Sequence, residues 1–323
     1  MPQTKIAYPA QTSTSDGILY DLMRDQSMVN SKNHEYTTRD GHLKGVLCDI
    51  TITAQADGYA FIYGANNTWK LRNSVRKFHF LREHMFRESG VKKSEMGTYG
   101  KTMRPYFDAD HAGGDTPDQP IFIMKDGGSG LTPTDFVGGE WKYTKLASVP
   151  SYEEQAGPET VLPEVDEWKI HLFDESVVDK TSSGSATGTT AAVTWSSVGM
   201  IHAYNLDRQS VQTQTTKTSI DGPNNPLAAL AGAGNQATGA IVELAEELEE
   251  ELPPYDLNDN GDSVHFAQLG FRQFPNTGGS YTFRNVFLPA GYMRVIMTDK
   301  NVAQSTYSID VDVLAEIDCR DLA

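Results

Sequence analysis

The chain has 323 residues, a formal net charge of −16 at pH 7 and a mean hydropathy of −0.45. This length allows one large domain or two ordinary ones with a substantial buried core. No run of residues approaches the roughly 20 apolar residues of a membrane-spanning helix, and the first residues show no secretion signal, so we expect no membrane insertion. The two cysteines, Cys48 and Cys319, are too few for a disulfide scaffold or a four-cysteine zinc site.

The negative charge is unevenly distributed along the chain. Residues 1–110 have a net charge of +3, whereas residues 111–323 have a net charge of −19. Within residues 69–104, ten Lys and Arg residues stand against three Glu residues. A surface that contacts phosphate groups is therefore expected in the first third of the chain.

Residues 1–45 mix Ser, Thr, Asn and charged residues, and we predict that they form a peripheral N-terminal arm. The arm contains one short amphipathic helix candidate, from Asp16 to Val29, whose first turn Asp16 would cap. The apolar side of this helix would carry Ile18, Leu19, Leu22 and Met23.

From Val46 the pattern changes to that of a β-strand. Cys48, Ile50 and Ile52 alternate with polar residues, which is the period of two typical of a half-buried strand. Further strands are predicted at 59–64, 120–125, 140–147, 167–175, 191–206, 264–274, 281–288, 292–298 and 306–318.

Two stretches have the spacing of helices. In residues 72–88, apolar side chains recur every three or four positions, and Gly90 ends the pattern. A second helix is predicted over 241–252, with a dense glutamate face, and Pro253 and Pro254 end it.

Many short strands, two helices and no βαβ alternation predict an all-β fold with minor helices. We expect an antiparallel eight-stranded jelly-roll β-sandwich over residues 46–323, with long loop insertions at 97–164 and 213–262. A double jelly roll would need about eight strands after residue 165, and about six are predicted, so a single roll is preferred. The first core strand and the last strand should be antiparallel neighbours, with Cys48 and Cys319 buried and close together.

Residues 256–262 match the first seven positions of a calcium loop, which needs oxygen ligands at alternate positions. The candidate ligands are Asp256, Asn258, Asn260 and Asp262. Position twelve is Ala267, where a bidentate glutamate belongs, so an ordinary turn is the competing interpretation. Calcium is the one cofactor that the sequence suggests.

Two other groups of residues resemble metal ligands. The first group consists of Asp108, Asp110, His111 and Asp115 in a glycine-rich loop, where simple solvation is the alternative. His171 and His202 fall in predicted strands and would suit a cupin-like metal site, or they are ordinary core histidines. The chain has neither the nucleophile elbow of a hydrolase nor a phosphate-binding loop, so we predict no catalytic residues and no enzyme activity.

The basic stretch suits phosphate neutralisation and stacking on single-stranded bases. The nucleic-acid-binding candidates are Lys70, Arg72, Arg76, Lys77, Arg82, Arg87, Lys92 and Lys93; the aromatic candidates are Trp69, Phe78, His79, Phe80, Phe86 and Tyr99. The alternative is a solvated helix face whose aromatic residues belong to the core. The glutamate-rich residues 243–251 either dock on a neighbouring subunit's basic surface or keep the exterior soluble.

Three stretches carry a resemblance to a known family: GMIHAYNLDRQSVQ (199–212), LPPYD (252–256) and FLPAGYMRVIMT…YSIDVDVLAEI (287–317). Together they resemble the jelly-roll capsid proteins of small viruses, particularly of single-stranded DNA viruses. The resemblance covers about the last 130 residues. It implies a coat protein that assembles with many copies of itself into a closed, icosahedral shell in the virion, with its inner face toward the viral nucleic acid. Residues 1–45 lack the arginine-rich arm with which many such coats begin.

The sequence therefore predicts a viral structural protein, and two other classes remain open. One is a phage fibre or lectin-like sandwich that binds carbohydrate, with calcium at 256–262. The other is a cupin-like metalloenzyme that uses His171 and His202.

Overall fold

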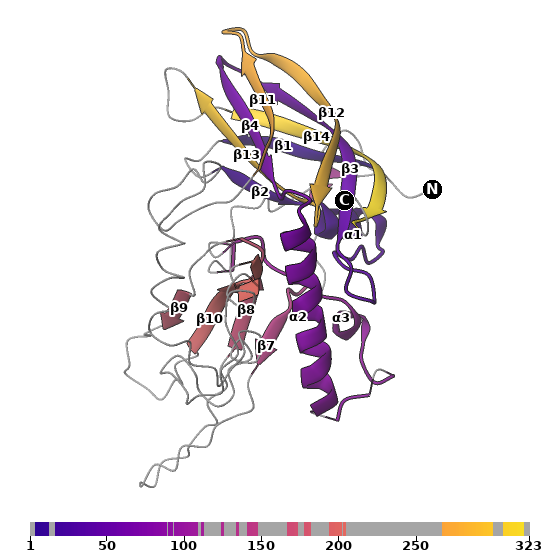
Figure 1. Cartoon of the computed structure of the whole chain (residues 1–323). Coiled ribbons are helices and arrows are strands. Elements are labelled where there is room, and N and C mark those ends of the chain that lie inside the picture. Colours follow the sequence, from indigo (N-terminus) through magenta and orange to yellow (C-terminus); the bar gives the residue numbers. More distant parts are fainter. Residues whose placement is uncertain are drawn as a thin grey trace, which may run out of the picture.

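A computed structural model describes most of the N-terminal third of the chain, parts of its middle and most of its C-terminal sixty residues. The described residues are 4–12, 17–88, 90–92, 94–108, 111–112, 124–125, 134–135, 141–147, 167–173, 178–181, 194–201, 203–204, 267–299 and 306–319. Within these residues, two four-stranded antiparallel sheets form a sandwich, and a smaller sheet and the longest helix extend from one end of it (Figure 1).

The first layer of the sandwich, sheet A, joins the two ends of the chain. Its order is β1 (Lys5–Thr12), β14 (Thr306–Asp318), β3 (Lys44–Ala54) and β12 (Gly279–Pro289), and every neighbouring pair is antiparallel. Strand β14 therefore has a hydrogen-bonded partner on each of its edges. Its ladder with β3 runs from Tyr307 opposite Ala54 to Asp318 opposite Lys44.

The second layer, sheet B, has the order β2 (Ile18–Asp21), β13 (Tyr292–Asp299), β4 (Gly58–Gly64) and β11 (Ala267–Phe274), again antiparallel throughout. The two sheets pack face to face because each strand turns its apolar residues inward. In β3, burial alternates as the period of two requires, with Cys48, Ile50 and Ile52 fully buried. Tyr8 of β1 and Tyr20 of β2 join the layers, with ring centroids 4.7 Å apart.

Helix α1 (Leu22–Asn30) connects β2 to β3, and a 202-residue insertion, residues 65–266, separates β4 from β11. The described part of the insertion begins with α2 (Trp69–Glu88) and α3 (Thr98–Lys101). It continues with sheet C, in the order β7 (Lys145–Ala147), β8 (Glu167–His171), β10 (Thr194–Gly199) and β9 (Val178–Thr181), and with the pair β5 (Met124–Lys125) and β6 (Thr134–Asp135). Strands β8 and β10 are parallel.

The predicted antiparallel β-sandwich with minor helices is confirmed at this level of detail. The strand predicted over 306–318 has those bounds, and it pairs antiparallel with the first predicted core strand. The helix predicted over 72–88 forms and begins three residues earlier, at Trp69. Within the described residues, no helix is long and apolar enough to cross a bilayer.

The prediction of a peripheral arm at 1–45 is wrong. Residues 5–12 and 18–21 are strands β1 and β2, each paired inside one layer of the sandwich. The helix begins at Leu22 rather than at Asp16, because Asp21 caps it and accepts a hydrogen bond from the backbone N–H of Arg24. The polar residues between these short elements concealed the alternation.

The expected closeness of Cys48 and Cys319 is also wrong, although both thiols are buried. Cys48 lies opposite Val313, whereas the backbone N–H of Cys319 donates to Leu43 O, five residues before Cys48. At about 3.3 Å per residue, this register separates the two cysteines by roughly 16 Å along the strand. Burial raises the pKa of Cys48 to about 12 and that of Cys319 to about 11.

The strands predicted at 167–175 and 191–206 form, but they belong to sheet C and not to the sandwich. The second of them ends at Gly199, and the chain continues in helical conformation at residues 200, 201, 203 and 204. The helix predicted over 241–252 and the excursion at 213–262 lie outside the described residues.

The register of β14 on β3 can be tested with cysteines. In a Val313→Cys variant the new thiol faces Cys48 across the ladder, so oxidation should give a 48–313 disulfide in non-reducing peptide mapping. Leu314→Cys is the matched control, because its side chain is exposed and lies on the other face of the strand. A Cys48–Cys319 disulfide in the oxidised native protein would contradict the register.

Candidate functional site

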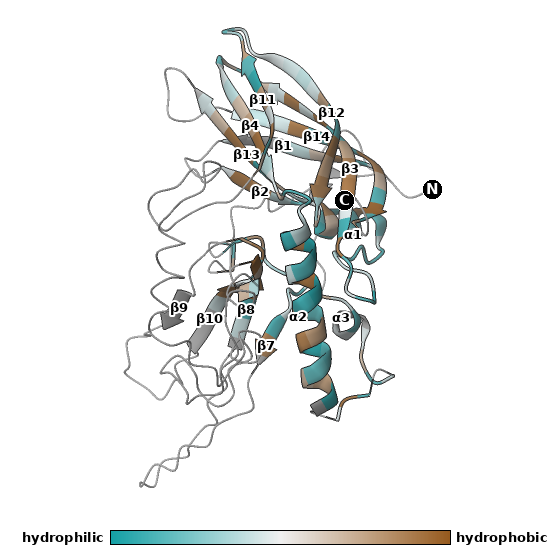
Figure 2. Ribbon diagram, in the orientation of Figure 1, coloured by the Kyte–Doolittle hydropathy of each residue, from teal (hydrophilic) through white to brown (hydrophobic). Residues whose placement is uncertain are grey.

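The basic stretch folds as the two-faced helix α2, about 30 Å long at 1.5 Å per residue. Leu71, Val75 and Phe78 recur at helical spacing and are buried. The opposite side, which we call the exposed face of α2, carries Trp69, Asn73, Arg76, Lys77, Phe80, His84 and Arg87, all exposed. Figure 2 shows hydrophilic residues along the length of this helix between the apolar ones.

The exposed face combines cations with two solvent-exposed aromatic rings. Trp69 is 46% exposed and Phe80 is 51% exposed, and the Arg76 guanidinium lies 5.7 Å from the centre of the Phe80 ring. Arg87 makes an ion pair of 3.8 Å with Glu83, and Lys77 is exposed one residue after Arg76. Rings and cations that alternate along about 30 Å suit a polyanion with stackable or apolar groups.

Three other predicted cations, Lys70, Arg72 and Lys92, lie off this face. Lys70 and Arg72 are half-buried, and Arg72 Nη1 donates to Asn67 Oδ1 at 3.2 Å. Lys92 is exposed after the end of the helix, and Lys93 lies outside the described residues. The structure thus gathers Arg76, Lys77 and Arg87 on one surface, and Lys70, Arg72 and Lys92 are not part of it.

The prediction that Arg82 contacts phosphate is wrong, because its side chain is buried. Its guanidinium donates to two backbone carbonyls beside α3, from Nη1 to Thr102 O at 2.6 Å and from Nη2 to Gly100 O at 3.2 Å. Burial lowers its pKa to about 10. Phe78 and His79 are also buried, so they belong to the core and do not stack on bases.

Because one arginine of α2 is buried and the other is exposed, we predict that alanine substitutions at Arg82 and Arg76 change the free energy of unfolding by different amounts. Arg82→Ala should lower the free energy of unfolding by about 2 kcal/mol, because it leaves two carbonyls without their donors. Arg76→Ala should change it by less than about 0.5 kcal/mol, because Arg76 is exposed. Urea unfolding of both variants measures the difference, and equal losses would contradict this division of roles.

The acidic cluster predicted as a metal site has a structural role where it is described. Asp108 accepts from the backbone N–H of His111 at 2.8 Å and from Arg294 Nη2 at 2.5 Å. His111 Nδ1 accepts from the backbone N–H of Phe107 at 3.0 Å. Asp110 and Asp115 lie outside the described residues.

The other metal predictions fall mainly outside the described residues. His171 is buried in β8 with its Nδ1 2.5 Å from the carbonyl oxygen of Phe173, and His202 lies outside, as does the 256–262 loop. In the part of the chain that the structure describes, no three His, Cys, Asp or Glu side chains gather as metal ligands would.

A buried polar junction, which no sequence pattern indicated, joins the sandwich to the insertion. At its centre, Asp21 caps α1 and accepts hydrogen bonds from the hydroxyls of Tyr36 and Tyr143, the latter at 2.8 Å. Asp25, one turn later, accepts from Tyr8 at 2.6 Å and from Arg24 at 2.9 Å. Tyr143 belongs to the insertion, so the two parts of the chain share one carboxylate.

Two further ion pairs cross the same junction. Arg104 binds Glu35 in bidentate fashion, at 2.6 and 3.1 Å, and its guanidinium lies 4.0 Å from the centre of the Trp141 ring. Arg294 of β13 binds Asp108 of the insertion. These partners are up to 186 residues apart in sequence, and no local pattern connects them.

Burial sets the protonation of this junction. It raises the pKa of Asp21 to about 6, even though Arg24 and the tyrosine donor favour the carboxylate. It lowers the pKa of His111 well below its ordinary value of 6.5, with help from Arg24 and Arg294, so this histidine stays neutral. Desolvation therefore outweighs the local hydrogen bonds at Asp21, whereas at His111 desolvation and the two arginines act in the same direction.

The raised pKa of Asp21 predicts that the stability of the protein depends on pH, and that replacing Asp21 by a neutral residue removes this dependence. The folded protein holds the Asp21 proton more tightly than the unfolded chain, so this carboxyl opposes folding as pH rises from about 4 to about 6. The rise in the pKa of Asp21 from 3.8 to about 6 corresponds to a loss of about 3 kcal/mol in the free energy of unfolding. The stability of Asp21→Asn relative to wild type should therefore rise between pH 4 and pH 7 in urea unfolding, with exposed Asp40→Asn as the control. Parallel curves for Asp21→Asn and wild type would contradict the shift.

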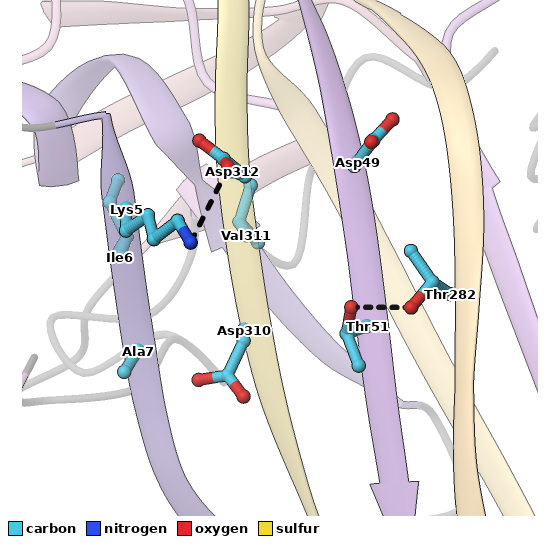
Figure 3. Close-up of a pocket in the computed structure, with 9 residues that line it drawn as sticks. All are labelled: Lys5, Ile6, Ala7, Asp49, Thr51, Thr282, Asp310, Val311 and Asp312. Atoms are coloured by element: carbon cyan, nitrogen blue, oxygen red, sulfur yellow. Dashed lines mark hydrogen bonds and ion pairs between the residues drawn. The ribbon is translucent and has the colours of Figure 1, made fainter.

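An open pocket of about 540 Å³ lies on the outer face of sheet A (Figure 3). Asp49 and Asp312 face each other across β3 and β14, and Lys5 of β1 pairs with Asp312 at 3.8 Å. The nine lining residues carry three carboxylates, one ammonium group and no histidine or cysteine. This face therefore attracts cations and repels phosphate.

Comparison of the chain with protein families, with characterised proteins and with solved structures finds no match.

Proposed function

We propose that this chain is a viral coat protein that assembles with copies of itself into a closed, icosahedral shell around the genome, without catalysing a reaction. The strand order of the sandwich carries this proposal. If the eight sandwich strands are counted in chain order, sheet A has the order 1-8-3-6 and sheet B has the order 5-4-7-2. This order supports an eight-stranded jelly roll, the architecture of viral capsid domains, some lectins and cupins.

The interior of the sandwich favours a structural role over a cupin-like metal centre. Its eight strands contain no histidine, and their inward side chains, such as Ile50, Val295 and Ile309, are apolar and fully buried. A shared fold does not fix a function, but a cupin metal site needs imidazole ligands inside the barrel.

An exposed aromatic group on sheet B favours assembly. Phe271 of β11 is 49% exposed and lies 5.0 Å from Phe61 and 5.9 Å from Tyr59 of β4, measured between ring centres. Tyr63 stacks on Phe61 at 6.1 Å. Tyr59, Phe61 and Tyr63 are half-buried, so Phe271 is the exposed ring of a continuous aromatic group. Aromatic groups of this kind mark contact surfaces, and a shell subunit needs such surfaces for its neighbours.

The distribution of charge suggests which surface meets the genome. The outer face of sheet A carries Asp49, Asp310 and Asp312, whereas the exposed face of α2 carries Arg76, Lys77 and Arg87. Phosphate groups favour the second surface. In the proposed shell, α2 lies toward the nucleic acid.

Particle formation tests the proposal directly. The purified full-length chain should form closed particles that light scattering and negative-stain electron microscopy detect. Phe271→Ser should impair assembly at least tenfold, whereas Gln273→Ser should leave it unchanged, because Gln273 is exposed two residues further along the same face of β11.

A chain that stays monomeric at all concentrations and salt conditions would overturn the proposed shell. Binding to a glycan array by such a monomer would favour the carbohydrate-binding sandwich instead.

A further inference from the structure

Four residues, which we call the 34–37 segment, bind both layers of the sandwich and the insertion. On the insertion side, Glu35 forms the bidentate ion pair with Arg104. The backbone N–H of Met103 donates to Thr37 Oγ1 at 3.0 Å. On the sandwich side, the two other residues of the segment contact one carboxyl group in each layer. The segment therefore lies where the three parts of the fold meet.

The first of these carboxyl groups belongs to Glu316 of β14 and contacts the imidazole of His34. His34 is only 8% exposed, and Lys44 Nζ lies 3.9 Å from the other oxygen of the carboxylate. The hydrogen bond with His34 lowers the pKa of Glu316 below its ordinary value of 4.5, and the charges of Lys44 and Lys32 act in the same direction, whereas burial opposes them. The contact is an ion pair only when His34 is protonated and Glu316 is ionised, as in mildly acidic solution.

The second carboxyl group, that of Asp21 at the end of β2, is fully buried. Tyr36 of the segment and Tyr143 of the insertion both donate to its Oδ2. Tyr292 of β13 stacks on the ring of Tyr36, with centroids 5.1 Å apart, and also faces Asp21. The hydroxyl donors are neutral, so they satisfy the carboxyl group without balancing a charge on it.

The charges around Asp21 favour its protonated form while the junction is closed. Arg24 donates to Asp25 from Nε and Nη2, both at 2.9 Å, so one guanidinium stands beside two buried carboxyl groups. His111 of the insertion also faces Arg24 and stays neutral. Burial, opposed by Arg24 and assisted by Asp25, raises the pKa of Asp21 to about 6. A protonated Asp21 therefore leaves Arg24 and Asp25 as a balanced pair.

We propose that the 34–37 segment is a pH-sensitive switch that holds the insertion on the sandwich most tightly in mildly acidic solution and opens more often in neutral solution. Near pH 5 the ion pair of His34 with Glu316 is complete and Asp21 is neutral. Near pH 7.5 the imidazole loses its charge, and Asp21 carries a buried charge that opening exposes to water. The switch acts within one chain and does not depend on the proposed shell.

Hydrogen exchange of the full-length chain tests this switch. Mass spectrometry of peptides that cover residues 31–44 gives their protection factor, corrected for the intrinsic effect of pH on exchange. The protection factor should fall about tenfold from pH 5 to pH 7.5, because opening lets the Asp21 carboxyl group ionise in water. An unchanged protection factor would overturn the proposal.

Residues 46–54 of β3 are the internal reference, because β3 lies between β14 and β12 in sheet A. If the 34–37 segment opens while the sandwich stays folded, its protection factor should be at least about tenfold below that of the reference at both pH values. Equal protection would mean that the segment opens only when the whole chain unfolds, which contradicts a switch.

Two substitutions separate the two carboxyl contacts. Asp21→Asn should remove most of the change between pH 5 and pH 7.5, because an amide does not titrate. His34→Gln should lower the protection factor about threefold at pH 5 and leave it unchanged at pH 7.5, because only the ion pair is lost. Exposed Asp40→Asn is the matched control and should behave as wild type. A full pH dependence in the Asp21→Asn/His34→Gln variant would assign the effect to other groups and overturn the proposal.

Discussion

The buried carboxyl groups at the junction between the sandwich and the insertion determine which polar side chains must pack around them. Asp21 and Asp25 are fully buried, and a charge taken out of water is tolerated only when polar partners surround it. Tyr8 and Arg24 supply partners from the N-terminal residues, whereas Tyr143 supplies one from the insertion. Asp25 finds its partners within the N-terminal residues, whereas Asp21 also depends on Tyr143, so the insertion contributes directly to the buried polar core.

The same principle separates the roles of the arginines. Arg82 and Arg104 are buried: Arg82 donates hydrogen bonds to backbone carbonyls, and Arg104 donates to Glu35. Arg76 and Arg87, by contrast, are exposed on α2. The residue type is the same in both sets, and burial distinguishes their roles. Among the described residues, the outer face of sheet A is acidic and the exposed face of α2 is basic.

The strands and helices whose apolar residues recur at a regular spacing could be predicted from the sequence. The alternation around Ile50 and the spacing around Val75 gave β3 and α2 nearly their observed bounds, because one face of each element is buried and the other is not. Strand β1 has polar residues at both ends and a proline in its middle, and β2 has four successive buried residues, so no long alternation marks either strand. The junction around Asp21 could not be predicted, because its partners come from distant segments whose pairing depends on the whole fold.

Strand β14 lies near the end of the chain, so sheet A can be completed only late in synthesis. Residues 306–318 fill the position between β1 and β3, and β1 pairs with no other described strand. Until the ribosome has made those residues, β1 lacks a partner and sheet A has an open gap. A product that ends before residue 306 therefore leaves β3 with an unpaired edge and β1 without its partner strand, so sheet A is completed only by the last residues to be synthesised.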